Sequence, residues 1–217
     1  LAGCGRISGK HFEAIEKHAD RMELVGVCDS SSERLAAATQ QTGATGYGDL
    51  GEMLEQASPD LVVLCTPSGL HPQQTMQIAA AGKHVMTEKP MATRWRDGLR
   101  MVEACDRVNV HLFVVKQNRS NATLKLLKRA VDQKRFGRIF MVVINVFWSR
   151  PQAYYDMDAW RGTWEFDGGA LMNQASHYVD LLDWLIGPVE SLQAYTATMA
   201  RDIQVEDTAA MNVRWRS

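Results

Sequence analysis

Short apolar runs alternate with amphipathic segments through the first half of the chain, and this rhythm limits its fold more than any other feature. Strands are expected at residues 24–28, 61–65, 84–87 and 111–115, and helices at residues 30–38, 73–81 and 96–107. Ser30 and Glu33 form a capping-box pattern at the start of the first of these helices. Such an alternation is typical of parallel strands joined by crossover helices. The first half is therefore predicted to be an α/β domain built on a parallel sheet.

The second half of the chain has a different texture. A basic amphipathic helix is expected at residues 122–133, β-structure at residues 139–148, 189–198 and 208–215, and a second helix at residues 171–186. Residues 151–166 form an irregular segment that is rich in aromatic side chains. We place the domain boundary near Lys116, which gives one domain of residues 1–116 and another of residues 117–217.

Composition argues against several classes of protein. The chain of 217 residues is 46% hydrophobic and 23% charged, which are ordinary values for a folded soluble protein. Its formal net charge of −1 provides no general field for gripping nucleic acid or an anionic membrane. No apolar run approaches the ~20 residues that are needed to cross a bilayer. We therefore expect neither a nucleic-acid partner nor a membrane partner.

The cysteines and the chain ends give three further expectations. The four cysteines are widely spaced and form no CxxC motif, so neither disulfides nor a metal site is expected. No secretory signal is visible, which predicts a cytoplasmic protein. The first residues, Leu1-Ala2-Gly3, look like the last part of a strand whose beginning is absent, so we expect a fragment that is truncated at its start.

A glycine turn, Gly3-Cys4-Gly5-Arg6-Ile7-Ser8, stands between this strand remnant and the first helical pattern. In a dinucleotide-binding domain the first glycine makes the turn, the second lets backbone approach the pyrophosphate, and the third permits close helix–strand packing. Ser8 takes the place of the third glycine. The pattern predicts a cofactor-binding segment that includes Gly3, Gly5, Arg6 and Ile7, with a plain tight turn as the alternative.

Asp29 ends the next expected strand, at the distance from the turn where a carboxylate accepts hydrogen bonds from an adenosine ribose. A carboxylate there repels a 2′-phosphate, and no arginine follows immediately. The sequence therefore favours NAD over NADP. A turn or helix-entry role is the alternative for Asp29.

Lys89 follows Glu88 at the end of the expected strand at residues 84–87 and precedes Pro90. Removing a hydride from an alcohol also requires a base for the hydroxyl proton and positive charge near the developing alkoxide. Lys89 can supply that charge. The alternative is a solvated lysine after a strand.

A polar stripe interrupts the otherwise apolar helix expected at residues 171–186. Asn173, His177 and Asp180 are spaced so that they share one helix face. Burying such groups without partners costs about 1–3 kcal/mol each, so the stripe must face a binding site or a satisfied network. His177 is our candidate general base, and Asn173, which cannot act as a base, is expected to hydrogen-bond the substrate or His177. Asp180 either orients His177 or is structural.

Taken together, Gly3-Cys4-Gly5, Asp29, Thr66-Pro67-Ser68-Gly69-Leu70-His71, Glu88-Lys89-Pro90 and residues 168–180 resemble the Gfo/Idh/MocA oxidoreductase family. The resemblance implies an N-terminal Rossmann domain and a C-terminal α/β domain with an open, mainly antiparallel sheet. Because chains of this family are longer, it also implies that the chain is truncated at its C-terminal end as well as at its start. It also implies that Lys89 lies beside the nicotinamide and the substrate hydroxyl, and Glu88 near the nicotinamide ribose. Thr66, Pro67 and His71 would line the cofactor site.

Within that family the chain is similar to the WlbA-type branch, through Lys116-Gln117-Asn118-Arg119, residues 160–165 and residues 168–177. This resemblance implies NAD-dependent oxidation of the 3-hydroxyl of UDP-N-acetylglucosaminuronic acid (UDP-GlcNAcA) in bacterial O-antigen sugar biosynthesis. It also implies that Asn118, Arg119, Tyr154 and Arg161 contact the substrate. The guanidinium groups of the two arginines suit its diphosphate or its carboxylate.

The same resemblance carries two expectations about partners. One concerns NADH: some relatives reoxidise it in place with 2-oxoglutarate, and the sequence leaves open whether this chain does the same. The other is assembly into a homodimer or homotetramer, in which the open sheet is covered by another subunit.

Two other readings of the function stay open. One is oxidation of inositol or of a free sugar by an enzyme of the same family, which would need no nucleotide on its substrate. The other is a non-catalytic NAD-binding regulator, which the presence of Lys89 and His177 disfavours.

Overall fold

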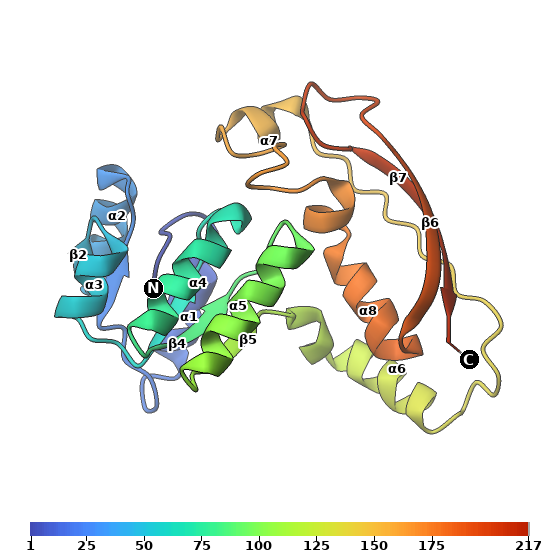
Figure 1. Cartoon of the computed structure of the whole chain (residues 1–217), viewed down its shortest axis with the longest axis horizontal. Helices are drawn as coiled ribbons and strands as arrows, with labels where there is room; N and C mark the ends of the chain where they lie inside the picture. The colour runs from blue at the N-terminus through green and yellow to red at the C-terminus, as the bar shows by residue number, and fades with distance from the viewer. Residues whose placement is uncertain (217) are drawn as a thin grey trace. The chain divides into compact units, whose positions relative to one another are not determined.

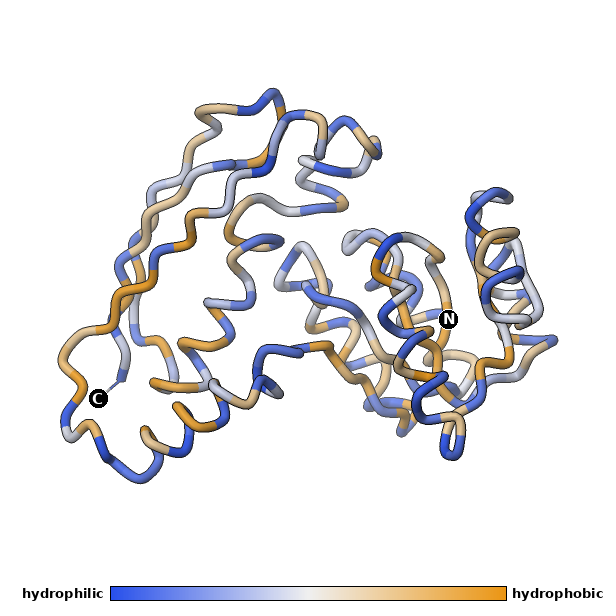
Figure 2. Tube along the Cα trace, turned by 180° about the vertical axis from the view of Figure 1, so that it is seen from behind, coloured by the Kyte–Doolittle hydropathy of each residue, from blue (hydrophilic) through white to orange (hydrophobic). Residues whose placement is uncertain are grey.

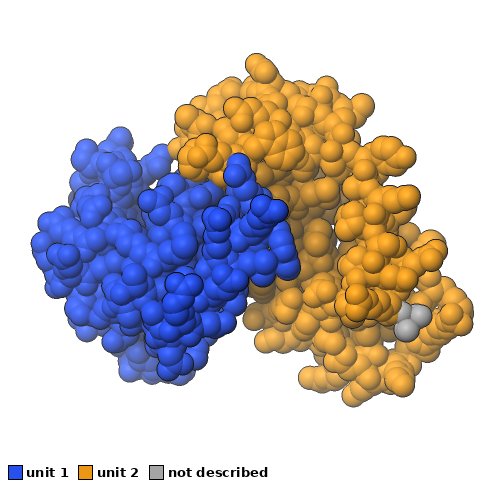
Figure 3. Space-filling view, viewed as in Figure 1, with its two compact units in different colours: residues 1–115 blue, residues 116–217 orange. Residues whose placement is uncertain are grey.

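The computed structural model of the chain describes residues 1–216. It divides into two compact units, one of residues 1–115 and one of residues 116–217, shown in different colours in Figure 3.

The first unit is built on a parallel sheet. Its strands are β1 (Gly26–Cys28), β2 (Thr45–Tyr47), β3 (Leu61–Leu64), β4 (His84–Thr87) and β5 (Leu112–Val114). β1 pairs with β2, and β4 lies between β3 and β5, all in parallel. Ala2 forms parallel bridges to both Cys28 and Leu64, so the extended residues at the start of the chain join the two groups of strands. The predicted parallel α/β fold is confirmed.

Helices flank this sheet and supply its core (Figure 1). They are α1 (Ser8–Lys17), α2 (Ser32–Thr42), α3 (Leu50–Gln56), the short 3-10 helix η1 (Ser68–Leu70), α4 (His71–Ala80) and α5 (Trp95–Arg107). Val62 and Val85 from the strands are completely buried, as are Ile78 of α4 and Met101 of α5. Strand β2 and helix α3 were not predicted, because neither carries a long apolar pattern.

Helix α2 begins one residue later than its capping box predicts. Ser31, not Ser30, caps the helix and accepts a hydrogen bond from the Arg34 N–H. The reason is Asp29, whose carboxylate accepts the Ser31 N–H at 2.8 Å and closes a turn before the helix can start.

The second unit combines helices with an antiparallel sheet. Its helices are the 3-10 helix η2 (Gln117–Ser120), α6 (Ala122–Asp132), α7 (Gln152–Asp156), the π-helix η3 (Ala170–Gln174) and α8 (Ser176–Ile186). Strand β6 (Val189–Ala197) pairs with β7 (Thr208–Trp215) in antiparallel register, with Ala197 opposite Thr208. α6 contacts α8, and the two strands curve past them in Figure 1. The expected antiparallel sheet is confirmed.

The β-structure expected at residues 139–148 is absent from the structure. The segment is apolar, as the hydropathy colouring of Figure 2 shows, but none of its residues takes part in a strand or a bridge. β-propensity states only that a residue suits a pleated, half-buried surface, whereas a strand also needs a paired neighbour. In the described chain β6 and β7 pair with each other, and this segment joins neither ladder.

The single helix expected at residues 171–186 is also wrong in detail. A π-helical turn, η3, precedes α8, and the Ala175 N–H donates to the Ala170 carbonyl at 2.7 Å. The wider turn places Asn173 and His177 on different elements. The polar stripe is therefore not one continuous helix face.

No helix within residues 1–216 combines the length and apolar character that crossing a membrane requires.

Gly3 gives a first test of the fold. Its φ is +91°, and an added Cβ would lie 2.6 Å from backbone atoms of Cys65 and Thr66. Gly3→Ala should therefore lower the free energy of unfolding by about 2 kcal/mol or more, through left-handed strain and overlap with backbone that cannot move away.

Gly5→Ala is the matched control, because an added Cβ at Gly5 meets nothing within 4 Å. Denaturant unfolding of both variants without ligand checks the prediction. Equal stability of the two variants would contradict it.

Candidate functional site

The glycine turn forms the amino-terminal end of α1. The Gly3 N–H donates to the Cys28 carbonyl at 2.8 Å, and α1 begins at Ser8 with neither a side-chain cap nor an acidic residue in its first turn. The first N–H groups of such a helix attract anions. Open space beside Gly5 leaves room for a ligand to approach the backbone. These features fit the pyrophosphate of a dinucleotide.

Ser8 replaces the expected third glycine without disturbing the turn. Its side chain is buried, and its hydroxyl donates to the Gly5 carbonyl at 2.6 Å. The hydroxyl is thus satisfied inside the turn, and a small buried side chain serves the close packing that glycine usually provides.

Asp29 holds the turn from the end of β1. Its two carboxylate oxygens accept the N–H groups of Cys4, at 2.7 Å, and Ser31, at 2.8 Å. A carboxylate has about four acceptor positions, so a ribose hydroxyl can still be accepted. Burial, followed by the charge of Asp29, raises the pKa of the Cys4 thiol to about 11. Cys4 therefore contributes its backbone N–H and not a reactive sulfur.

Glu88 stands at the carboxyl end of β4 and is buried. Its side chain accepts the Lys89 N–H at 3.2 Å and lies 2.8 Å from the Nε2 of His11, on α1. Burial raises the pKa of Glu88, but the hydrogen bond and charge of His11, with the N–H and charge of Lys89, outweigh it and lower the pKa overall. The pair ties the first helix to the strand end that carries Lys89.

His11 was missed by the sequence analysis. The available signal was its position, one turn into the helix that follows the glycine turn, which is where a side chain can reach the next strand ends.

Lys89 is half-buried, and the Lys89–Pro90 peptide is cis. His71 supports the segment of Lys89 and Pro90. Its Nδ1 lies 3.1 Å from the Pro90 carbonyl oxygen, and its Nε2 lies 3.0 Å from the Thr66 carbonyl oxygen. Burial lowers the pKa of His71 against the raising effect of these hydrogen bonds. A neutral ring can donate to only one of the two carbonyls.

His71 therefore joins the Thr66-Pro67 segment to the segment of Lys89. Its side chain is completely buried, so the structure gives it a structural task. Its contact with the cofactor stays a prediction, as do those of Thr66 and Pro67.

In the second unit, Asn173 of η3 and His177 of α8 occupy the start of the apolar helix. His177 is buried, and the Asn173 Nδ2 donates to the Asp167 Oδ1. Asp167 is buried as well and was not identified from the sequence, because a single aspartate directly after an irregular aromatic segment carries no pattern.

Asp180 is engaged by cations. Its carboxylate accepts the Arg119 Nε at 2.8 Å and Nη2 at 2.7 Å, and the Lys116 Nζ lies 3.7 Å away. The hydrogen bond to Asp180 raises the pKa of Arg119. The structural reading of Asp180 accounts for these contacts. Asn118 lies on η2 beside Arg119.

Tyr154 lies between two guanidinium groups. The Arg161 Cζ is 4.4 Å and the Arg150 Cζ 5.1 Å from the centre of its ring. Arg161 also donates to Asp158, at 3.1 Å, and only 9% of its side chain is exposed. Local contacts therefore occupy much of Arg161.

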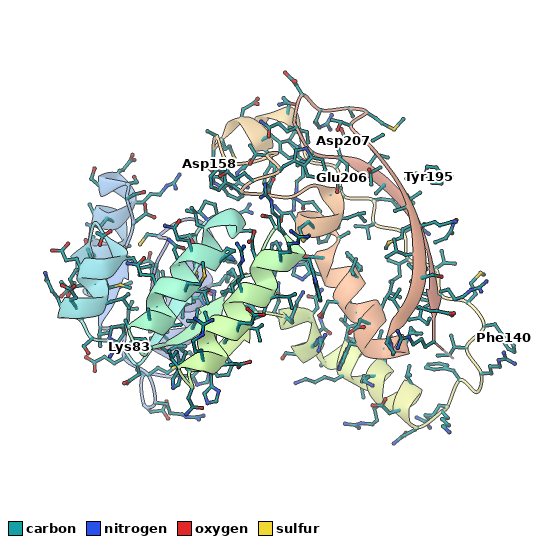
Figure 4. The ribbon with its side chains drawn as sticks, viewed as in Figure 1. Lys83, Phe140, Asp158, Tyr195, Glu206 and Asp207 are labelled. Atoms are coloured by element: carbon teal, nitrogen blue, oxygen red, sulfur yellow. The ribbon has the colours of Figure 1, made fainter. Side chains whose placement is uncertain are left out.

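A hollow of about 440 Å³ lies next to this group, lined by residues of the 158–166 segment and by Gln204. Asp158, labelled in Figure 4, is one of the residues that line it. None of the candidate catalytic residues lines this hollow, so we assign it no part in the reaction. Within residues 1–216, no group of three or more His, Cys, Asp and Glu side chains is arranged to hold a metal ion.

The His11–Glu88 pair predicts a pH-dependent contribution to stability. Because the pKa of Glu88 is lowered from 4.5 in the folded state, the pair stabilises above pH 4.5, and that stability is lost as pH falls through the lowered pKa. His11→Ala should cost about 1–3 kcal/mol at about pH 6 and distinctly less at about pH 3.5, as measured by urea unfolding.

Lys10→Ala is the matched control, because Lys10 pairs with Glu13 on the exposed face of the same helix. Its cost should be small, since exposed ion pairs contribute little. A cost of His11→Ala that is the same at both pH values would contradict the assignment.

Comparison with known proteins shows to which family the chain belongs. Residues 1–116 match the family model described as the GFO/IDH/MocA oxidoreductase family, NAD-binding Rossmann fold, and residues 124–217 match the GFO/IDH/MocA C-terminal domain.

Two solved structures are similar over the whole chain. The WlbA dehydrogenase of Chromobacterium violaceum, in complex with NADH and UDP-GlcNAcA, is 68% identical, with a TM-score of 0.98, and the match covers 100% of this chain and 63% of that one. The WlbA dehydrogenase of Bordetella pertussis, in complex with the same two ligands, is 63% identical, with a TM-score of 0.98, over 100% of this chain and 67% of that one.

Among curated proteins, the myo-inositol 2-dehydrogenase of Thermotoga maritima is 29% identical, over 100% of this chain and 64% of that protein. The chain thus spans about two thirds of the length of these relatives. It belongs to the Gfo/Idh/MocA family of oxidoreductases, with an NAD-binding Rossmann domain followed by the family's C-terminal domain.

Proposed function

We propose that the protein is an NAD-dependent dehydrogenase that oxidises the 3-hydroxyl of UDP-GlcNAcA to the 3-keto sugar, in bacterial O-antigen sugar biosynthesis. The observation that carries this proposal is the likeness to two WlbA dehydrogenases. Both are more than 60% identical through the whole of this chain, and both were crystallised with NADH and UDP-GlcNAcA.

The first unit fits the cofactor. The turn at Gly3 and Gly5, followed by Arg6 and Ile7, would hold the pyrophosphate at the start of α1. Asp29 would accept the adenosine ribose and disfavour a 2′-phosphate. Thr66 and Pro67, at the end of β3, and Glu88, at the end of β4, would line the nicotinamide half.

The reaction removes a hydride from a carbon and a proton from its hydroxyl. A bound nicotinamide supplies the hydride acceptor. Lys89 would place positive charge beside the hydroxyl and stabilise the alkoxide as it forms. Its backbone is fixed by Glu88, which accepts its N–H, and its chain direction is set by the Pro90 segment that His71 holds.

The second unit would supply the base and the substrate contacts. His177 would take the hydroxyl proton, and Asn173 would hydrogen-bond the substrate or His177. Arg119, with Asn118 beside it, would bind an anionic group of the substrate. Asp180 holds two of the N–H donors of Arg119 and leaves the rest of a five-donor guanidinium for that purpose. Tyr154 and Arg161 are further candidates.

Three parts of the proposal rest on resemblance alone. They are the reoxidation of NADH by 2-oxoglutarate, the assembly into a dimer or tetramer, and the position of the reaction in O-antigen sugar biosynthesis. The proposed cytoplasmic location rests on the sequence, in which no secretory signal is visible.

A second candidate is oxidation of myo-inositol, because the Thermotoga maritima relative is named for that activity and aligns over the whole chain. The difference in identity, 29% against 68%, favours the nucleotide sugar.

A substrate panel tests the proposal. The full-length protein should form NADH, followed by its absorbance, when it meets NAD and UDP-GlcNAcA in the presence of 2-oxoglutarate and in its absence. UDP-N-acetylglucosamine, which lacks the carboxylate, and myo-inositol are the comparison substrates. Turnover of myo-inositol alone would favour the second candidate, and no turnover of any of them, with NAD binding intact, would overturn both.

Lys89→Met should lower kcat by about a hundredfold or more, because the charge beside the hydroxyl is lost, while NAD still binds. His177→Asn should lower kcat to a similar degree. Lys83→Met is the matched control, since Lys83 precedes β4 at the opposite end of the strand and donates to Ser58 at 3.0 Å (labelled in Figure 4). Full activity of Lys89→Met would exclude the proposed role of Lys89.

A further inference from the structure

Asp167 is a buried carboxylate that contacts the candidate residue Asn173 and was not among the residues predicted from the sequence. Asp167 is 2% exposed. Its Oδ2 accepts the Gly162 N–H at 2.7 Å, and its Oδ1 accepts the Asn173 Nδ2. A buried charge is costly unless hydrogen bonds replace its hydration, and these contacts do so. Asp167 thus joins the loop of Gly162 to the side chain of Asn173.

The contact decides which way the amide of Asn173 points. An ionised carboxylate can only accept hydrogen bonds, so the amide must present its NH₂ group to Asp167. The reverse orientation would set the amide oxygen against a carboxylate oxygen. The carbonyl oxygen of Asn173 is therefore held on the side away from Asp167.

A different carboxylate, that of Glu206, holds the backbone that carries Asn173. Glu206, labelled in Figure 4, accepts the Leu171 N–H at 3.0 Å through its Oε1, and its backbone carbonyl accepts the Ala170 N–H at 2.9 Å. Gly169 leaves room for this carboxylate, since an added Cβ there would overlap it. The π-helical turn therefore starts from fixed hydrogen bonds, and the Asn173 N–H closes back on the Gly169 carbonyl at 2.9 Å.

We propose that Asp167 is a positioning residue that orients the Asn173 amide so that position 173 presents a hydrogen-bond acceptor to the substrate or to His177. The two positions must therefore carry different groups: a carboxylate at position 167 requires an amide at position 173. An aspartate at 173 would bring a second carboxylate into contact with that of Asp167, which is buried, and the two would repel until one takes up a proton. The catalytic part of this inference rests on the proposed function, whereas the coupling between the two side chains does not.

Exchanging the two groups tests the proposal in the full-length protein. Asn173→Asp alone should lower the Tm at neutral pH, because of the repulsion. Asp167→Asn alone keeps the Gly162 hydrogen bond through the new amide oxygen and turns its NH₂ toward Asn173. Asn173 must then flip, so kcat with UDP-GlcNAcA should fall about a hundredfold while KM for NAD changes little.

The double variant, Asp167→Asn with Asn173→Asp, restores a donor at 167 that faces an acceptor at 173. Its Tm should return toward that of the native protein, and its kcat should exceed that of Asp167→Asn by about tenfold or more.

Asp207→Asn is the control for loss of a structural carboxylate in the same unit. Asp207 accepts the N–H groups of Met199, Ala200 and Arg201 and the hydroxyl of Thr208. This variant should lower Tm without changing kcat.

The coupling would be overturned if the changes in Tm caused by the two single substitutions simply added in the double variant. This outcome does not depend on which substrate the enzyme uses. Restored Tm in the double variant, with no native turnover of UDP-GlcNAcA, would keep the coupling and reject the proposed substrate. Native kcat in Asp167→Asn would reject the positioning role.

Discussion

Parallel hydrogen bonding by the first three residues is the constraint on which the first unit depends. The Ala2 N–H donates to the Val63 carbonyl at 2.8 Å, the Cys65 N–H donates to the Ala2 carbonyl at 2.7 Å, and the Gly3 N–H donates to the Cys28 carbonyl at 2.8 Å. These bonds insert the start of the chain between β1 and β3 and bring the carboxyl ends of neighbouring strands to one edge. The turn at Gly3 must then pass against the backbone of Cys65, where no side chain fits. A ligand-binding edge of this kind follows from the order of parallel strands, as in other open α/β sheets.

Carboxylates that are buried or half-buried hold the backbone at the candidate residues of each unit. Asp29 fixes the glycine turn and Glu88 fixes the backbone of Lys89, whereas Asp167 and Glu206 fix the turn that carries Asn173. Each carboxylate accepts at least one backbone N–H, which replaces part of its lost hydration and locks a loop at the same time. Such support is what a catalytic group requires in order to stay within a fraction of an ångström of its working position.

Much of the first unit could be predicted because its strands are buried runs bounded by turn residues. The expected strand at residues 84–87 coincides with β4, and the turn at Gly3 lies where the glycine spacing put it. The second unit was harder. Its segment at residues 139–148 is rich in β-forming residues yet pairs with neither strand, because pairing depends on neighbours that a local pattern does not contain. His11 and Asp167 escaped notice for a related reason, since each matters through one partner that is far away in sequence or set in an irregular loop.

The break before α8 shows how a correct choice of residues can coexist with an incorrect geometry. A regular helix over residues 171–186 would have placed Asn173, His177 and Asp180 on one stripe and made a single relay of them. The π-helical turn separates Asn173 from this stripe and turns it toward Asp167, while Asp180 pairs with Arg119. The polar groups are thus divided between two supports, one that orients an amide and one that holds a guanidinium. Single π-helical turns occur frequently at functional sites. In this protein the direction that changes is that of Asn173, and the proposed hydrogen bond to the substrate or to His177 depends on it.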